Sequence, residues 1–121
     1  VHHQLLQRFM LAAHSGDRNA IEALLSEDAQ LIGDGGGKVP SFPKPLVGPF
    51  RIANLYWALF RRLGAQVAYR MALINGEPGL LRYVDGHLES AQAFVTDGEQ
   101  IVAIYAVRNP DKLAGIPATL G

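Results

Sequence analysis

Apolar and polar residues follow a helical period in three segments of the first half of the chain. The first segment covers residues 2–14. Asp17 then favours the N-cap of a second, short helix that ends at Glu27-Asp28. The third segment, from Phe50 to Leu63, has the clearest pattern, with apolar residues spaced as one face of a helix. The first half of the chain is therefore predicted to hold three helices.

The second half of the chain changes to a period of two, which is typical of strands. Strands are predicted over residues 67–73, 80–84, 87–95 and 101–107, and a short one over residues 29–33. Asp85-Gly86 and Asp97-Gly98 are hairpin signals, and residues 75–79 are expected to form a turn. Because residues 101–107 are apolar on both faces, their strand should lie in the centre of the sheet.

This order of elements predicts the fold class. Helices followed by an antiparallel meander indicate an α+β protein. One strongly curved, mainly antiparallel sheet packed on the three helices would bury every apolar stripe. It would also leave a cone-shaped cavity between the sheet and the long helix.

Two segments show no period at all. Residues 35–49 hold three consecutive glycines and four prolines, and residues 108–121 form a tail with two prolines. Glycine weakens regular structure and proline interrupts it, so both segments are predicted to be irregular. A loop of about 15 residues is long for a compact domain, and such loops are usually functional or disordered. The loop over residues 35–49 is therefore the first candidate for a functional segment.

Composition narrows the class of protein. The 121 residues suit a single domain, 1–121. The first residue is Val rather than Met, so we expect either a processed chain or, in preference, a piece of a longer protein. A formal net charge of zero argues against direct DNA binding through phosphate contacts. The absence of cysteine excludes disulfides and cysteine-ligated zinc. No membrane span, metal site or cofactor is predicted, since no apolar run is long enough and no two histidines have a ligand spacing.

The triple-glycine motif is the first candidate for chemistry. Gly35, Gly36 and Gly37 could let backbone amides converge on a phosphate beside Lys38, although the spacing of a Walker A loop is missing. A turn that needs positive φ angles explains the glycines equally well. Asp34, where a strand leaves the sheet near the predicted cavity, could act as a general base or could cap its own turn.

Aromatic residues supply a second set of candidates. A ligand cavity could be lined by Phe9, Tyr56, Trp57, Phe60 and Tyr105. Aromatic residues at helical spacing also serve as plain core. Trp57 lies beside the apolar stripe of its helix, so it is the better candidate for an interface, where tryptophan is enriched.

The whole chain resembles the SnoaL-like or ketosteroid-isomerase-like superfamily, which has the cone-shaped NTF2-like fold. This resemblance rests on an ordered set of motifs, Gln7-Arg8-Phe9, Ser15-Gly16-Asp17, Leu24-Leu25, Glu27-Asp28-Ala29, Asp34 and Val47-Gly48. Three further motifs are together similar to bacterial extracytoplasmic-function sigma factors that carry a SnoaL-like C-terminal extension. They are Asp34-Gly35-Gly36-Gly37-Lys38-Val39, residues 75–79, and Tyr105-Ala106-Val107-Arg108-Asn109-Pro110-Asp111-Lys112-Leu113.

The resemblance implies a regulatory domain that contacts the promoter-reading sigma core in cis and works with RNA polymerase in the cytoplasm. The contacts would come from the loop and the tail, through Asp34, Gly35, Gly36, Gly37, Lys38, Asn109, Pro110, Asp111, Lys112 and Leu113. Members of the superfamily often form homodimers through the sheet face, and the sequence leaves this possibility open.

The isomerase branch of the superfamily implies a different function that this sequence supports poorly. There, an aspartate base works with two oxyanion donors, a tyrosine on the first helix and a protonated aspartic acid on the sheet. On this sequence the base position falls on Asp34, but the tyrosine donor falls on Phe9 and the second donor near Ala91. Loss of one donor costs a factor of about 10² to 10³ in rate. We therefore expect no enzymatic activity; the alternative is a small-molecule binder or an isomerase- or cyclase-like enzyme with Asp34 as base.

Overall fold

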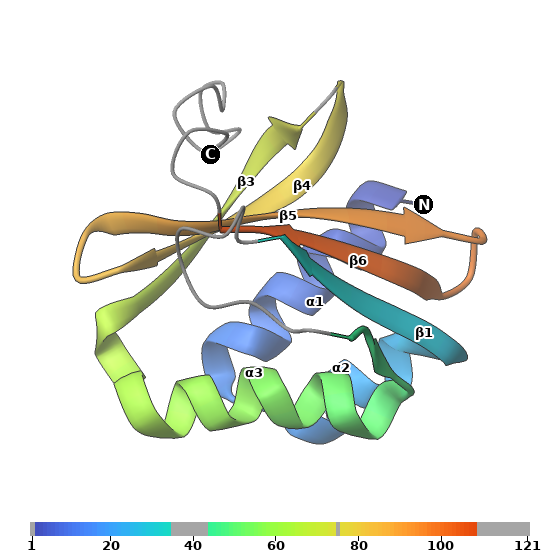
Figure 1. Cartoon of the computed structure of the whole chain (residues 1–121), viewed down its shortest axis with the longest axis horizontal. Coiled ribbons are helices and arrows are strands. Elements are labelled where there is room, and N and C mark those ends of the chain that lie inside the picture. The colour runs from blue at the N-terminus through green and yellow to red at the C-terminus, as the bar shows by residue number, and fades with distance from the viewer. Residues whose placement is uncertain (1, 35–43, 75, 109–121) are drawn as a thin grey trace.

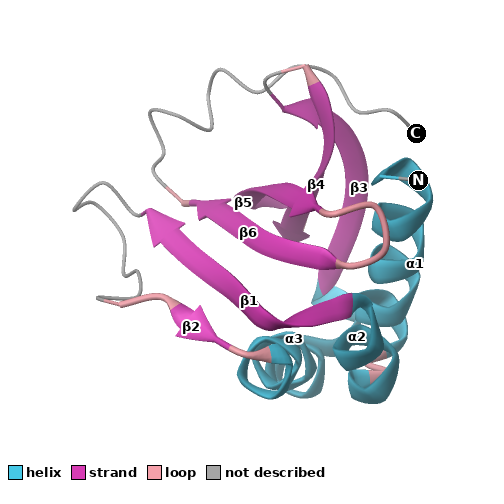
Figure 2. Ribbon diagram, turned by 90° about the vertical axis from the view of Figure 1, so that its right-hand side faces the viewer, coloured by secondary structure: helices cyan, strands magenta, loops and turns pink. Residues whose placement is uncertain are grey.

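Three helices cover one face of a single curved, six-stranded sheet (Figures 1 and 2). The computed structural model describes residues 2–34, 44–74 and 76–108. The helices are α1 (His2–Ser15), α2 (Arg18–Leu24) and α3 (Pro49–Leu63), and a 3-10 turn, η1 (Gly64–Gln66), follows α3. The strands are β1 (Leu25–Asp34), β2 (Leu46–Val47), β3 (Val67–Ile74), β4 (Glu77–Val84), β5 (His87–Thr96) and β6 (Ile101–Val107).

The order of strands across the sheet is β2-β1-β6-β5-β4-β3. Strands β3 to β6 form the predicted antiparallel meander, and β1 adds to it parallel to β6. The predicted α+β class, with three helices on a curved and mainly antiparallel sheet, is confirmed. Strand β6 lies between β1 and β5, in the centre of the sheet, as its apolar sequence predicts.

Strand β1 is longer than the sequence predicts. The charge pattern predicts that Glu27-Asp28 closes the second helix, but α2 ends at Leu24 and both residues belong to the strand. Pairing of Leu25 with Ile101 of β6 starts the strand early, and the register shifts before Gln30. Glu27 and Asp28 therefore lie where the pairing of β1 with β6 is irregular. The local pattern of charges in the sequence does not reveal this pairing.

The predicted loop over residues 35–49 also contains regular structure. Strand β2 pairs with β1 through Leu46 opposite Leu31, and the Gly48 amide donates to the Ala29 carbonyl at 2.8 Å. Pro49 then begins α3, where its missing N–H costs nothing because the first turn of a helix has no acceptor for it. Residues 35–43 lie outside the described part of the chain.

The strands of the meander match their predicted bounds to within one residue, except at the start of β4. Asp85 and Gly86 have φ angles of 52° and 81°, as expected of a tight hairpin turn. Strand β4, however, starts at Glu77, within the turn predicted over residues 75–79. Pro78 is tolerated in this strand because pairing of β4 with β5 begins only at Gly79, so that no ladder bond on that side is lost.

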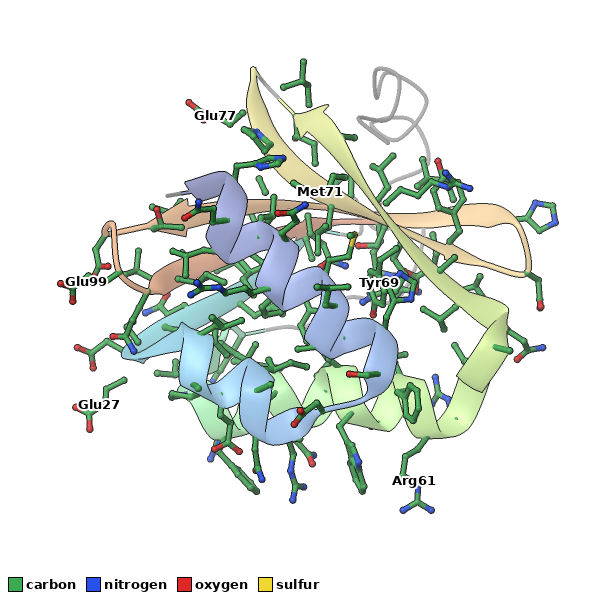
Figure 3. The ribbon with its side chains drawn as sticks, turned by 180° about the vertical axis from the view of Figure 1, so that it is seen from behind. Glu27, Arg61, Tyr69, Met71, Glu77 and Glu99 are labelled. Carbon is green, nitrogen blue, oxygen red and sulfur yellow. The ribbon has the colours of Figure 1, made fainter. Side chains whose placement is uncertain are left out.

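The core lies between α1, α3 and the concave face of the sheet. Phe9 of α1 is fully buried and meets the rings of Tyr56 and Phe94 edge-on, with centroids 4.9 and 5.1 Å apart. Tyr69 and Met71 of β3 lie between that strand and α1 (Figure 3).

The cap predicted for the second helix is present. Asp17 precedes α2, and its carboxylate accepts a hydrogen bond from the Ala20 amide at 3.1 Å. The bond satisfies one of the amides that the first turn of a helix leaves without an acceptor. Within the described residues, no helix is both long and apolar enough to cross a bilayer.

Candidate functional site

A cavity of about 250 Å³ lies between α3 and the concave face of the sheet. Its apolar lining is Leu31, Gly33, Leu55, Leu59 and Ala106, and its polar lining is Tyr56, Arg62, Arg82, Glu89, Gln92 and Arg108. The cavity therefore occupies the place where the sequence predicts one, but its polar groups come mostly from the strands.

Two periodicities bring these residues together. On α3, Leu55, Leu59 and Arg62 share one helical face because they are four and three residues apart. On the sheet, Leu31 and Gly33 of β1 are two residues apart, so both face the cavity. Strands β4, β5 and β6 contribute Arg82, Gln92 and Ala106 from their inner faces.

A buried hydrogen bond joins α3 to the sheet at the cavity wall. The Tyr56 hydroxyl donates to Oε1 of Gln92 at 2.6 Å, and Nε2 of Gln92 donates to the Ser90 hydroxyl at 3.3 Å. All three residues are almost completely buried. Burial raises the pKa of Tyr56 far above the ordinary value for a phenol, because a phenolate would be poorly solvated there. Tyr56 therefore stays protonated and acts as a donor.

A three-residue ion cluster forms the other polar wall. The carboxylate of Glu89 accepts from Nε of Arg82 at 3.0 Å and lies 3.4 Å from Nη2 of Arg108. Glu89 is the extra residue of an irregularity in the β4–β5 ladder, where Arg82 pairs with Ser90 and Tyr83 with Leu88. An extra residue in one strand re-aims a side chain, which explains how Glu89 reaches the cavity.

Arg82 is the most deeply buried charge of this wall. Its residue is 6% exposed, and its guanidinium carbon lies 5.8 Å from the ring centroid of Tyr56 and 6.0 Å from that of Tyr69. Burial lowers the pKa of Arg82, but Tyr69, Tyr56 and Glu89 together raise it to a value above the ordinary one. The side chain is therefore a fixed cation at the edge of the cavity.

Of the five aromatic residues predicted to line a cavity, Tyr56 lines this one. Phe9 belongs to the closed core behind it. Phe60 packs against the backbone of Gly16, on the side of α3 that faces the α1–α2 connection. Tyr105 is 45% exposed, and its neighbour Ala106 faces the cavity, so Tyr105 lies on the outer face of the sheet.

Trp57 lies outside the cavity, in a cluster of aromatic rings and arginines on the helical side. The guanidinium carbons of Arg18 and Arg61 lie 5.0 and 5.1 Å from its ring, and Arg18 also lies 5.8 Å from the ring of Phe50. Arg61 extends away from the body of the protein (Figure 3). Trp57 thus stands beside the buried stripe rather than within it, and its role at an interface stays a prediction.

The loop and tail motifs fall largely outside the described residues. Gly35, Gly36, Gly37 and Lys38 of the loop and Asn109, Pro110, Asp111, Lys112 and Leu113 of the tail all lie outside them. The described chain ends on either side are nevertheless neighbours, since the backbone of Asp34 pairs with that of Val107. The loop and the tail thus leave the sheet from adjacent ends of two parallel strands, β1 and β6 (Figure 2).

The positions that the isomerase comparison singles out do not form an oxyanion site. Phe9 carries no hydroxyl and lies in the core. Ala91 packs with Ala72 and Leu81 in a separate small cluster, whereas its neighbours Ser90 and Gln92 belong to the inner face. The hydroxyl of Tyr56 is already engaged by Gln92.

Sequence reasoning missed the charged wall of the cavity. Arg82 follows Leu80 by two residues, so it occupies the same buried face of β4, and Gln92 stands in the same relation to Phe94. A polar residue on the buried face of an apolar strand is the signal that could have revealed both. Glu89 could not be found in this way, because its direction depends on the irregular pairing of β5.

Fold and cavity together define a SnoaL-like, NTF2-like domain. No protein-family model matches the chain. Solved structures nevertheless share the fold, among them an NTF2-like protein from Cytophaga hutchinsonii, with a TM-score of 0.62 at 15% identity over 94% of this chain and 95% of the other. A SnoaL-like protein from Burkholderia thailandensis has a TM-score of 0.65 at 13% identity, over 86% and 90% of the two chains.

A stronger similarity identifies the particular branch. The chain is homologous to the ECF RNA polymerase sigma factor SigJ of Mycobacterium tuberculosis, with 32% identity over an alignment 126 residues long that covers 96% of this chain. The crystal structure of SigJ matches with a TM-score of 0.77 at 26% identity, again over 96% of this chain. The chain spans 40% of the length of that relative and 45% of the chain in its crystal structure. The resemblance to the SnoaL-like domains of extracytoplasmic-function sigma factors is thereby confirmed.

Proposed function

We propose that the chain is the C-terminal regulatory domain of a bacterial extracytoplasmic-function sigma factor and modulates transcription initiation through contacts with the sigma core. The observation that carries this proposal is the 32% identity to an ECF sigma factor over 96% of the chain. In this function the partners are the sigma core domains in cis and RNA polymerase, and the place of action is the cytoplasm. DNA contacts would be left to the core, in keeping with a net charge of zero.

The docking surface in this proposal consists of the loop segment Asp34–Lys38 and the tail segment Asn109–Leu113. Its support is the pairing of Asp34 with Val107, because the two segments follow the neighbouring C-terminal ends of β1 and β6. Lys38, Asp111 and Lys112 would supply charged contacts to the core. Prolines in the loop and the tail would reduce the ordering cost of docking. An equilibrium between clamped and released arrangements would then set the activity of the factor.

Catalysis is the less favoured alternative, with Asp34 as base. The relative that matches at 32% identity is named as a sigma factor rather than an enzyme. The arrangement of Phe9 and Ala91 supports the same choice, because neither position offers a donor to a developing oxyanion.

The proposal is tested by deleting residues 109–121 from the full-length factor and measuring transcription from its promoter in vitro. Arg108 is kept, because it contacts Glu89 at the cavity wall. We expect transcription to change several-fold. A matched control replaces the exposed Arg51 of α3 by Ala, which removes a surface charge outside both docking segments. Unchanged transcription after deletion, with the protein still folded, would remove the tail from the mechanism.

A further inference from the structure

The cavity carries an excess of positive charge that the docking function does not use. Among the residues that the structure describes, three arginines line it, Arg62, Arg82 and Arg108, against the single carboxylate of Glu89. Glu89 already contacts two of them, Arg82 and Arg108, through different oxygens. One carboxylate therefore contacts two guanidinium groups, and among the described side chains of the lining the cations outnumber the carboxylate.

The surroundings of Arg82 indicate which kind of ligand would balance this positive charge. Its side chain is 7% exposed and its residue lines the cavity. Its Nη1 atom is buried and has no hydrogen-bond partner among the described residues. A buried donor of a charged group that lacks an acceptor is costly, and an anion within reach would relieve that cost. In a site with little water the attraction is also stronger than at a surface.

We propose that this cavity binds a small organic monocarboxylate, with its carboxylate paired to Arg82 and its apolar body against α3. Leu55 and Leu59 of α3 and Leu31 of β1 offer the apolar wall. Arg62, at the end of α3, and Arg108 add positive charge near the carboxylate. Tyr56 and Gln92 form a fixed polar floor, since each is held by the hydrogen bond between them.

The lining favours one negative charge over several. Glu89 lies against both Arg82 and Arg108, so a phosphate or polyphosphate would meet a carboxylate at the same place. A metal ion is a poor fit, because the described part of the lining holds one carboxylate among three cations. The apolar wall also distinguishes an organic acid from an inorganic anion.

This ligand deepens the proposed function and rests on it where regulation is concerned. Arg108 lines the cavity and directly precedes the tail. A bound carboxylate that attracts Arg108 toward the cavity would thus change the position at which the proposed docking segment of the tail begins. Binding itself is a property of this chain alone and is measured without the sigma core, so the two ideas can fail separately.

The test is titration of the 121-residue chain with hexanoate and benzoate, followed by amide chemical shifts and by the shift of the thermal midpoint. Hexanamide, benzamide and inorganic phosphate serve as matched probes without the charge or without the apolar body. We expect saturable shifts at residues of α3 and β4 with the two carboxylates, and at least tenfold weaker binding of the amides and phosphate. A bound carboxylate raises the thermal midpoint in proportion to the logarithm of its concentration above Kd.

Two variants assign the binding to Arg82. Arg82→Met keeps the length of the side chain and removes its charge, and we expect about 10- to 100-fold weaker carboxylate binding, the range for a hydrogen bond to a charged group. Arg62→Met tests the same cavity at an exposed position and avoids loss of fold; we expect a smaller decrease. Arg51→Met, exposed on α3 and outside the cavity, is the matched control and should bind as the unchanged chain does.

Three results would overturn the proposal. They are the absence of carboxylate binding up to millimolar concentration, equal binding of the neutral amides, and binding that survives both Arg82→Met and Arg62→Met. Unchanged transcription after deletion of residues 109–121 from the full-length factor, while the isolated chain still binds carboxylate, would instead count against the docking function alone.

Discussion

At the scale of single residues, the hydrogen bond from Tyr56 to Gln92 anchors the long helix to the sheet. Both side chains are almost fully buried, and the bond is 2.6 Å long. Burial raises the pKa of Tyr56, so the hydroxyl keeps its proton over the whole physiological range. One wall of the cavity is therefore held by a neutral contact that does not change with pH.

Tyr56→Phe tests this anchor. Loss of the hydroxyl leaves Oε1 of Gln92 buried without its donor, so we expect the free energy of unfolding to fall by about 1–3 kcal/mol. Urea unfolding of the isolated chain measures it. Tyr83→Phe is the matched control, since Tyr83 is only partly buried and packs against the small cluster of Ala72, Leu81 and Ala91. Its effect should stay within about 0.5 kcal/mol. Equal effects of both changes would contradict the anchoring role.

Sequence periodicity could predict part of this site. The position of Tyr56 on the buried face of α3 follows from helical spacing, and Arg82 shares the buried face of its strand with Leu80. The same reasoning misplaces Tyr105, because an apolar strand does not reveal which of its two faces is covered. The partner of a buried charge is even harder to predict from the sequence. Glu89 reaches Arg82 only because the pairing of β4 with β5 is irregular at this point.

At the scale of elements, local signals predict the helices and hairpins, and long-range pairing decides the rest. Asp17 and Asp85-Gly86 act through their own backbone neighbours, which is why the sequence alone predicts the cap and the turn. Strand β2 has two residues and exists because they pair with β1. What determines β2 is its pairing with β1, which the residues next to β2 in the sequence do not encode. Those residues are rich in glycine and proline and predict only a loop.

The connection between α1 and α2 provides a test at this scale. Gly16 has a φ angle of 67°, and a Cβ there would overlap the ring of Phe60 on α3. Gly98 has a φ angle of 97° and open space around its Cα. Gly16→Ala adds a steric clash to the backbone strain, whereas Gly98→Ala adds strain alone, which costs about 1–2 kcal/mol.

We therefore expect Gly16→Ala to lower the free energy of unfolding by about 1–3 kcal/mol more than Gly98→Ala does, the range for an overpacked core. Thermal or urea unfolding of the two variants gives the difference directly. Equal losses would mean that the ring of Phe60, which is 37% exposed, moves away freely and does not hold the connection between α1 and α2 in place.

At the scale of the whole molecule, sequence and structure agree on the fold and the ancestry. The order of helices and strands predicts the α+β cone, and the motifs predict the sigma-factor branch that the homology to SigJ supports. Periodicity does not predict the proposed docking surface, because residues 35–49 and 108–121 show no period in the sequence. The pairing of Asp34 with Val107 supports the proposal that the two segments start side by side.

Docking is tested most directly by adding this domain, as a separate chain, to a factor that lacks it. The 121-residue chain is mixed with the remainder of the full-length factor, and association is followed by calorimetry and by transcription in vitro. We predict a saturable one-to-one complex that restores the activity of the intact factor, and several-fold weaker association for Lys38→Ala with Asp111→Ala. The matched control is Arg51→Ala, which should associate normally. No association, together with unchanged transcription when the whole domain is removed, would contradict a regulatory role.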